Sequence, residues 1–189
     1  MSDHPVSRIG TLPRDAWPPE FATAMERMTA PGREPLALFT AVAQSPRAWE
    51  RFSAASMAGP SPLSMRDREV VIDRTAAKTG NEYEWGIHTK VFAKKAELTP
   101  EQVRSTYDGH ADDGNWSAHD AALIATVDAL LARNRLSDAE FARLAAEFDT
   151  AQVLEIVQLV AFYNGIALIV GALDLQPEAG MPRFPDNKD

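Results

Sequence analysis

Apolar residues recur every three or four positions along most of the chain, which is the spacing that places side chains on one face of an α-helix. One run shows the pattern clearly: Leu123, Ile124, Val127, Leu130 and Leu131. The alternation of apolar and polar residues that is typical of β-strands is not sustained anywhere. The sequence therefore predicts an all-α fold, an orthogonal helical bundle of about eight or nine helices.

Capping residues and breakers predict where these helices begin and end. Three helices open on a polar residue followed three positions later by an acidic one, the pattern of a capping box: Ser64 with Asp67, Asn81 with Glu84, and Ser137 with Glu140. The helix that opens at Asn81 is expected to run to about Ala96, and a short one is expected over 35–44. The first helix is expected to open at Pro18 and Pro19, with its apolar stripe formed by Phe21, Met25 and Met28.

The last predicted helix, from Thr150 to about Leu173, is apolar on several sides. Such a helix is expected either in the centre of a fold or at a contact between subunits. Glu155, Gln158 and Asn164 argue against a membrane span.

Length and charge set the broad class. A chain of 189 residues has the size of one domain, expected over 1–189 with extended arms at 1–17 and 177–189. The net charge of −8 disfavours nucleic acid and anionic membranes as partners. The N-terminus lacks the apolar core of a signal peptide, so we expect a cytoplasmic protein. No glycine motif for phosphate or dinucleotide binding is present, and no cofactor is predicted.

The strongest chemical candidate is a histidine flanked by carboxylates. Glu84 and His88 are four residues apart on one predicted helix and therefore share a face. Glu69 on the preceding helix can approach His88 if the two helices pack as an antiparallel pair across Gly80. A carboxylate beside an imidazole fixes its tautomer and raises its pKa, which suits general acid and base catalysis.

Each candidate also has a structural interpretation. Glu84 can serve only as the helix cap, and Glu69 can pair with Arg66 or Arg74 on its own helix surface. Tyr83 and Trp85 can line a pocket, although aromatic residues at such positions are more often part of a core. A metal site built from Glu69, Glu84 and His88 is disfavoured because the cluster contains a single histidine, and none is predicted.

Four segments carry a family resemblance: LSMRDREVVIDRTA from Leu63, NEYEWGIHTKVFAKKAELTPEQV, HDAALIATVDALLARNRLSDAEF and FYNGIALIVGALDL. Together they resemble the carboxymuconolactone decarboxylase and AhpD-like proteins. In the AhpD peroxidase branch a glutamate is followed 19 residues later by a histidine, with a CxxC pair between them, and Glu69 and His88 have that separation. The two cysteine positions fall on Asn81 and Glu84. Since the chain has no cysteine, disulfide-based peroxide reduction is excluded.

The string from Tyr83 to His88 resembles the cysteine-free, decarboxylase-like branch, which implies a helical protomer assembled in a homo-oligomer. The function predicted on this basis is a cofactor-independent lyase or isomerase for a small anionic substrate, a carboxylated lactone or keto acid. His88 is the expected acid or base, with Glu69 or Glu84 orienting its ring. The residues expected to contact substrate are Arg74, Tyr83, Trp85, Tyr163 and Asn164.

Two other classes of function stay open at this point. One is a non-catalytic, oligomeric binding or scaffold protein that kept the fold and lost the chemistry. The other is a metal-dependent oxygenase or hydrolase. A histidine that opens to solvent with a carboxylate in hydrogen-bonding reach would favour the enzyme, and one bonded only to backbone would favour the scaffold.

Overall fold

The computed structural model describes residues 7–30, 32–56 and 59–185. Over these residues the chain forms nine α-helices and no β-strand, which confirms the predicted fold class. The helices are α1 (Pro19–Met28), α2 (Ala37–Val42), α3 (Pro46–Ala55), α4 (Met65–Lys78), α5 (Glu82–Phe92), α6 (Pro100–Asp108), α7 (Ala118–Arg133), α8 (Asp138–Glu147) and α9 (Thr150–Leu173).

Helix caps largely follow the sequence. The predicted capping boxes at Ser64 and Ser137 are both formed. Asn81 caps α5 through its side chain, but the Glu84 carboxylate does not return to the cap, so no capping box forms there. Glu84 is therefore free for another contact.

Several boundaries differ from the sequence prediction. The second helix covers only Ala37–Val42, and α5 ends at Phe92 because the chain turns back at Glu97, whose φ is 55°. The Leu98 amide closes this turn by donating to the Ala93 carbonyl. Met28 was expected on the apolar stripe of α1 but is exposed.

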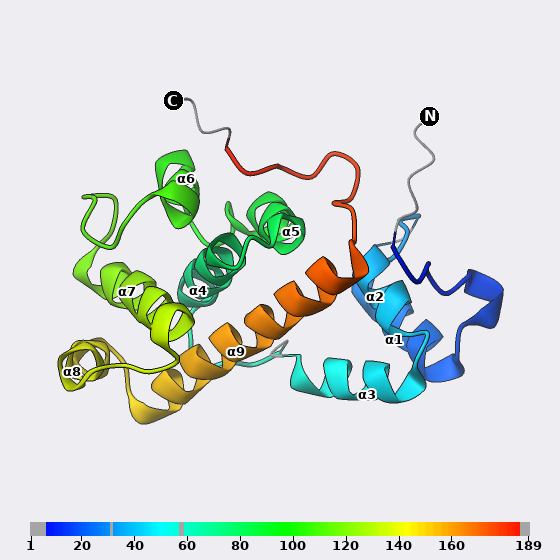
Figure 1. The fold of residues 1–189 in the computed structure, drawn as a ribbon, viewed down its shortest axis with the longest axis horizontal. Coiled ribbons are helices and arrows are strands. Elements are labelled where there is room, and N and C mark those ends of the chain that lie inside the picture. Colours follow the sequence, from blue (N-terminus) through cyan, green and yellow to red (C-terminus); the bar gives the residue numbers. More distant parts are fainter. Residues whose placement is uncertain (1–6, 31, 57–58, 186–189) are drawn as a thin grey trace.

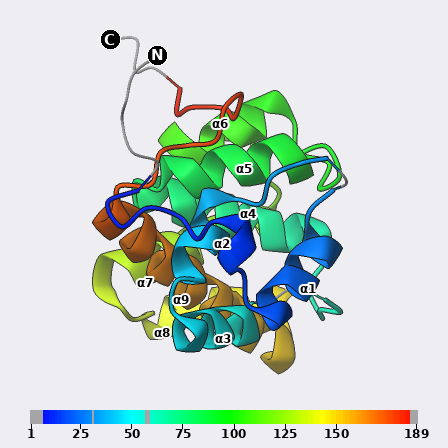
Figure 2. The same ribbon diagram turned by 90° about the vertical axis from the view of Figure 1, so that its right-hand side faces the viewer.

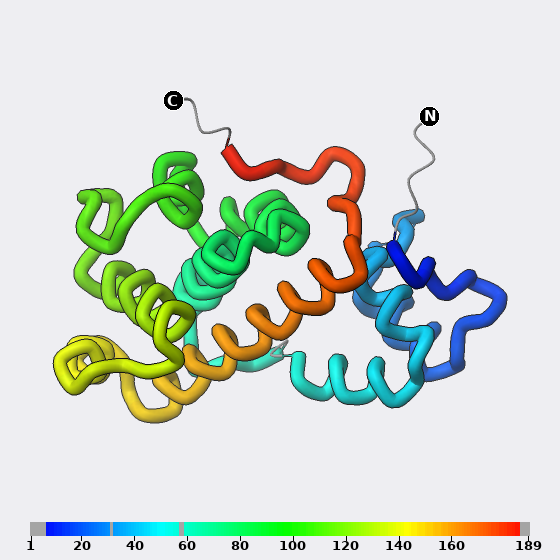
Figure 3. The backbone as a smooth tube through the Cα atoms, viewed as in Figure 1, coloured from blue at the N-terminus to red at the C-terminus, as the bar shows by residue number. Residues whose placement is uncertain are grey.

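The long helix α9 divides the molecule (Figure 1). Helices α4 to α8 lie on one side of it and α1 to α3 on the other. On the first side, α4 packs against α5, α6, α7 and α9. Figure 3 shows the same two groups of helices as a backbone tube, with α9 between them. The apolar core is correspondingly in two main parts, one around α4 and α7 and one around α1 to α3, and α9 contributes to both.

The C-terminal segment was expected to be an extended arm, and it is irregular but packed. It passes over α5 toward α6, as Figures 1 and 2 both show. Glu178 accepts hydrogen bonds from the Ala37 amide and the Tyr83 hydroxyl, both at 2.8 Å. Gly86 allows the close approach, since a Cβ at this position would lie 2.4 Å from the Pro182 carbonyl oxygen. At the other end, a single 3₁₀ turn interrupts the expected N-terminal arm at Arg14–Ala16.

One side of α9 is poorly covered. The helix is long and apolar enough to cross a membrane, and 28% of its most apolar stretch is buried. Leu154, Val157 and Leu168 are exposed, Leu168 by 70%. A central helix of a globular protein would have these side chains covered.

A buried arginine ties α4 to α6 and α7. Arg74 is 0% exposed, and its Nε and Nη2 donate to the Asp128 carboxylate at 2.7 and 2.6 Å. Its Nη1 faces the carbonyl oxygens at the end of α6, those of Ser105, Thr106 and Gly109, at 3.0 to 3.3 Å. The guanidinium thus caps the C-terminal end of α6, where carbonyl groups lack a partner in the next turn, although the Ser105 carbonyl also accepts from the Gly109 amide.

We expect Arg74→Met to lower the free energy of unfolding by about 3 to 5 kcal/mol, because it leaves Asp128 and the α6 carbonyls without their donor. Urea unfolding followed by circular dichroism measures the change. The control is Arg104→Ala, which removes an exposed ion pair with Asp108 and should cost less than about 1 kcal/mol. Equal losses in the two variants would contradict the structural role of Arg74.

Candidate functional site

The hairpin of α4 and α5 brings the predicted carboxylates and histidine together. Gly80 has a φ of 68° and makes the tight turn between the helices, and the Asn81 amide donates to the Ala76 carbonyl. Glu69 on α4 then faces His88 on α5. The predicted antiparallel approach of these two residues is present in the structure.

His88 lies among three oxygen-bearing side chains. Its Nδ1 is 2.8 Å from Glu69 Oε2, and its Nε2 is 3.2 Å from the Tyr163 hydroxyl and 3.5 Å from Glu84 Oε2. The Tyr163 ring, from α9, also packs edge-on against the imidazole. No nitrogen of the ring therefore depends on backbone for a partner.

The site is largely closed to solvent. His88 is 8% exposed, and Glu69 and Glu84 are buried as well. Burial weakens the competition from water, so the contacts between these charged groups are stronger than they would be on the surface.

The environment favours a charged imidazole. Burial of the ring opposes its charge, but hydrogen bonds to Glu69 and Glu84 and the charges of both carboxylates raise the pKa of His88 from 6.5 to about 10. At neutral pH the ring is then an imidazolium with both nitrogens protonated. Because this pKa is raised on folding, His88 contributes stability that is fully present below about pH 6.5 and is lost as the pH rises through about 10.

Asp73, one turn after Glu69 on α4, is the fourth ionisable group of the cluster. It is 0% exposed, and neither carboxyl oxygen has a hydrogen-bond partner among the described residues. Burial raises the pKa of Asp73 well above its usual value. The charge of His88 acts to lower this pKa, and the charge of Glu69 acts to raise it further. Burial and the nearby glutamates likewise raise the pKa of the Tyr163 hydroxyl.

Among the described residues, Glu69, Asp73 and His88 offer ligand atoms within 4.8 Å of one another, close enough to hold a metal ion. Both imidazole nitrogens already face side-chain oxygens, Nδ1 that of Glu69 and Nε2 those of Tyr163 and Glu84, so a metal ion bound to His88 would have to displace one of these contacts.

Three residues predicted to contact substrate lie outside the cluster. Arg74 is enclosed by Asp128 and the end of α6, so its guanidinium is not available to an anion. Tyr83 is buried in the core with its hydroxyl on Glu178, and the Trp85 indole donates to the Thr106 hydroxyl at 3.0 Å. Asn164 is half-buried on α9 beside Tyr163.

Asp73 and Arg68 were not singled out from the sequence. The signal for Asp73 was its position four residues after Glu69, which places both on one face of α4. Arg68 pairs with Glu155 of α9 at 3.1 Å, and its charge lowers the pKa of Tyr163 against the larger effect of burial. Sequence spacing alone could not show that α9 brings its residues to this place.

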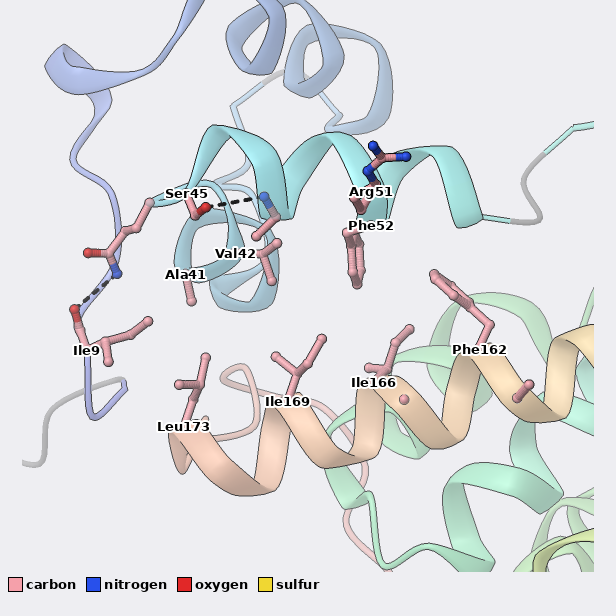
Figure 4. Close-up of a pocket in the computed structure, with 14 residues that line it drawn as sticks. Ile9, Ala41, Val42, Ser45, Arg51, Phe52, Phe162, Ile166, Ile169 and Leu173 are labelled. Atoms are coloured by element: carbon pink, nitrogen blue, oxygen red, sulfur yellow. Dashed lines mark hydrogen bonds between the residues drawn. The ribbon is translucent and has the colours of Figure 1, made fainter. Parts of the chain in front are cut away.

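A pocket among the described residues lies away from the cluster. It has a volume of about 640 Å³ and is a mainly apolar groove between α9 and the helices α2 and α3 (Figure 4). Phe52, Ile166 and Ile169 point into it, with Arg51 at one edge. Neither His88 nor Tyr163 lines it, so the groove does not provide direct access to the imidazole.

Residues 43–128 match the profile of the Carboxymuconolactone decarboxylase family. The match includes Glu69, Glu84 and His88 but not Tyr163. This confirms the resemblance to the carboxymuconolactone decarboxylase and AhpD-like proteins. No protein of curated function matches the sequence significantly.

Solved structures share the fold across nearly the whole chain. An uncharacterized peroxidase-related protein from Silicibacter sp. TM1040 has a TM-score of 0.82 at 15% identity, and the similarity covers 98% of this chain and 99% of that one. An AhpD-core, peroxidase-related protein from Ralstonia eutropha JMP134 also has a TM-score of 0.82, at 17% identity, covering 93% and 94%. A cysteine-to-alanine variant of the debrominase Bmp8, bound to 2,3,4-tribromopyrrole, has a TM-score of 0.73 at 16% identity, covering 90% and 91%. At these identities the similarity shows the fold alone.

We expect Glu69→Gln to lower the pKa of His88 by roughly one unit or more, because the substitution removes the negative charge nearest to Nδ1. Titration of the imidazole by ¹H–¹⁵N NMR measures this pKa directly. Glu26→Gln on the exposed face of α1 is the matched control and should leave it unchanged. An unchanged pKa in Glu69→Gln would show that Glu69 does not hold the imidazolium.

Proposed function

We propose that this chain, of which residues 43–128 match the model of the Carboxymuconolactone decarboxylase family, is a cytoplasmic, cofactor-independent lyase or isomerase. Its substrate is a small carboxylated lactone or keto acid. The observation that carries the proposal is the environment of His88. Glu69 contacts its Nδ1, and Glu84 and Tyr163 both face its Nε2.

His88 supplies a proton in this mechanism. When a carboxylated substrate loses CO₂, the C–C bond breaks and its electron pair stays on the substrate as an enolate. The Nε2–H of the imidazolium then protonates the enolate carbon, and the ring is left neutral with its Nδ1–H still on Glu69. Isomerisation by the same residue would instead start from the neutral ring, which would remove a proton from one carbon and return it to a neighbouring carbon.

The glutamate at position 84 supports proton transfer in place of redox chemistry. Peroxide reduction by the thiol-bearing branch needs paired cysteines, and this chain has Asn81 and Glu84 at those positions. Asn81 caps α5, and Glu84 faces the histidine. The carboxylate adds to the negative charge that keeps the proton on the imidazole.

Arg68 is the cation that suits an anionic substrate, in place of the expected Arg74. Its side chain is 17% exposed, and a single guanidinium N–H bonds to Glu155 among the described residues. The remaining donors are available for a carboxylate, which an arginine binds in a two-pronged geometry. Its charge lowers the pKa of the Tyr163 hydroxyl, so Arg68 lies near enough to Tyr163 to hold a substrate at the edge of the cluster.

We expect His88→Gln to lower kcat by at least roughly a hundredfold on a carboxylated lactone or keto acid that the wild-type protein turns over, because it removes the proton donor. Arg68→Gln should mainly raise KM, since it removes charge from binding and leaves the donor in place. Steady-state kinetics on a panel of such acids measures both. Full turnover by His88→Gln would disprove the mechanism.

A second candidate, a non-catalytic binding or scaffold protein, is favoured by the separate apolar groove. This groove is the kind of concave, mainly apolar surface that binds ligands or partners, and the chemical cluster does not line it. The criterion that separates the two candidates is met in part. The partners of His88 are carboxylates and a phenol instead of backbone groups, which favours the enzyme. The ring is buried and does not line the groove, which favours the binding protein.

We also propose that the protein is a homo-oligomer that covers the exposed face of α9. Leu154, Gln158, Ala161, Gly165, Leu168 and Ala172 follow one another at alternating steps of four and three residues along this helix. This is the spacing of a helix–helix seam, and the small residues at 161, 165 and 172 allow a close approach. A second copy of the same helix is therefore the expected partner.

We expect Leu168→Glu to shift the protein toward the monomer, because the interface would have to bury an unpaired carboxylate. Light scattering coupled to size-exclusion chromatography measures the mass. Phe141→Glu, at an exposed apolar position on α8, is the control and should keep the wild-type mass. A wild-type protein that is monomeric at high concentration would rule out the assembly.

A further inference from the structure

The carboxyl group of Asp73 lacks the partners that a buried charge requires. Among the described residues, the buried side-chain atoms without a hydrogen bond are both oxygens of Asp73 and Nδ2 of Asn81. Asp73 is 0% exposed, so water at the surface does not solvate it. An ionised carboxylate in this position would carry a large desolvation cost that nothing offsets.

The groups around Asp73 do not supply a compensating charge. Glu69 lies on α4, the same helix as Asp73. Glu84 and His88 come from α5, and Tyr163 comes from α9. His88 is the one cation among these groups, and its nitrogens already face Glu69, Glu84 and Tyr163. Neither neighbouring arginine forms an ion pair with Asp73: Arg68 pairs with Glu155 and Arg74 with Asp128.

We propose that Asp73 holds a proton in the resting protein and is a positioning residue for Glu69 during proton transfer. Its O–H donates a hydrogen bond to the Glu69 carboxylate once His88 has lost its charge. This role rests on the proposed function, but the protonation of Asp73 can be tested without a substrate.

The need for such a donor follows from the charge balance of the reaction. Before the transfer, the imidazolium neutralises Glu69 across 2.8 Å. After it, Glu69 is a buried carboxylate beside a neutral ring, a state that costs several kcal/mol unless hydrogen bonds stabilise it. A carboxylic acid kept neutral by its apolar surroundings can donate to a developing negative charge, as it does in ketosteroid isomerase.

The geometry permits this contact. Oxygens of Asp73 and Glu69 and a nitrogen of His88 all lie within 4.8 Å of one another. The two acidic residues are one turn apart on the same face of α4, which places their carboxyl groups side by side. An ionised Asp73 could only repel Glu69 at this separation.

The first experiment tests the proton itself in the full-length protein at neutral pH. We expect infrared spectroscopy to show a carboxylic-acid C=O band that disappears in Asp73→Asn. The control is Asp67→Asn: Asp67 is also buried on α4 but accepts hydrogen bonds from Ser64 and contacts His119, and its replacement should leave the band in place.

The band also separates a proton from a metal ion. We expect the spectrum to be the same after treatment with EDTA and after addition of Mn²⁺. A band that is absent in the purified protein, or that Mn²⁺ removes, would overturn the proposal and assign Asp73 to a cation site with Glu69 and His88.

The second experiment tests the positioning role. Asp73→Leu, which keeps the size of the side chain but has no donor, should lower kcat by roughly tenfold or more with little change in KM. Asp73→Asn keeps a neutral donor and should restore kcat to within roughly threefold of wild type. Equal losses in the two variants, with folding intact by circular dichroism, would overturn the role. If His88→Gln is fully active while the Asp73 band is present, the proposed function fails and the protonation of Asp73 stands.

Discussion

The pairing of buried charges along α4 is the constraint on which the rest of the structure depends. This helix is enclosed by four others, so each buried charged side chain on it needs a partner from another element. Asp67 meets His119, Arg68 meets Glu155, Glu69 meets His88 and Arg74 meets Asp128. These pairs fix α5, α7 and α9 around α4. Asp73 is the exception, because its buried carboxyl oxygens have no partner among the described residues.

Those parts of the fold that depend on neighbouring residues could be predicted from the sequence. The capping boxes at Ser64 and Ser137 and the bounds of α9 are set by side chains within a few positions of each other, and all are present. The Glu69–His88 pair was also predictable, because the Gly80 turn and the family spacing constrain a short hairpin. The role of Arg74 was not, since its partners lie 31 to 54 residues away and only the tertiary fold brings them to it.

Glu84 stands where the resemblance to the thiol-bearing branch implies a cysteine. It lies one turn before His88 on α5, and its carboxylate faces the imidazole. A thiol can form a disulfide, whereas a carboxylate cannot; it can hold a charge or a proton instead. Two carboxylates on opposite nitrogens then orient the imidazole and raise its pKa together.

A pKa of about 10 for His88 is high for a general acid at neutral pH, and the chemistry of the proposed reaction explains why it is tolerable. General acids work best with a pKa near the ambient pH. A weaker acid transfers its proton less readily, and a stronger acid has already lost its proton at that pH. An enolate carbon is much more basic than imidazole, however, so the transfer remains favourable. What limits the step is the charge left on Glu69 and Glu84 when the imidazolium is gone. A third ionised carboxylate at Asp73 would make that state still less stable, and a neutral Asp73 that donates to Glu69 lowers its cost.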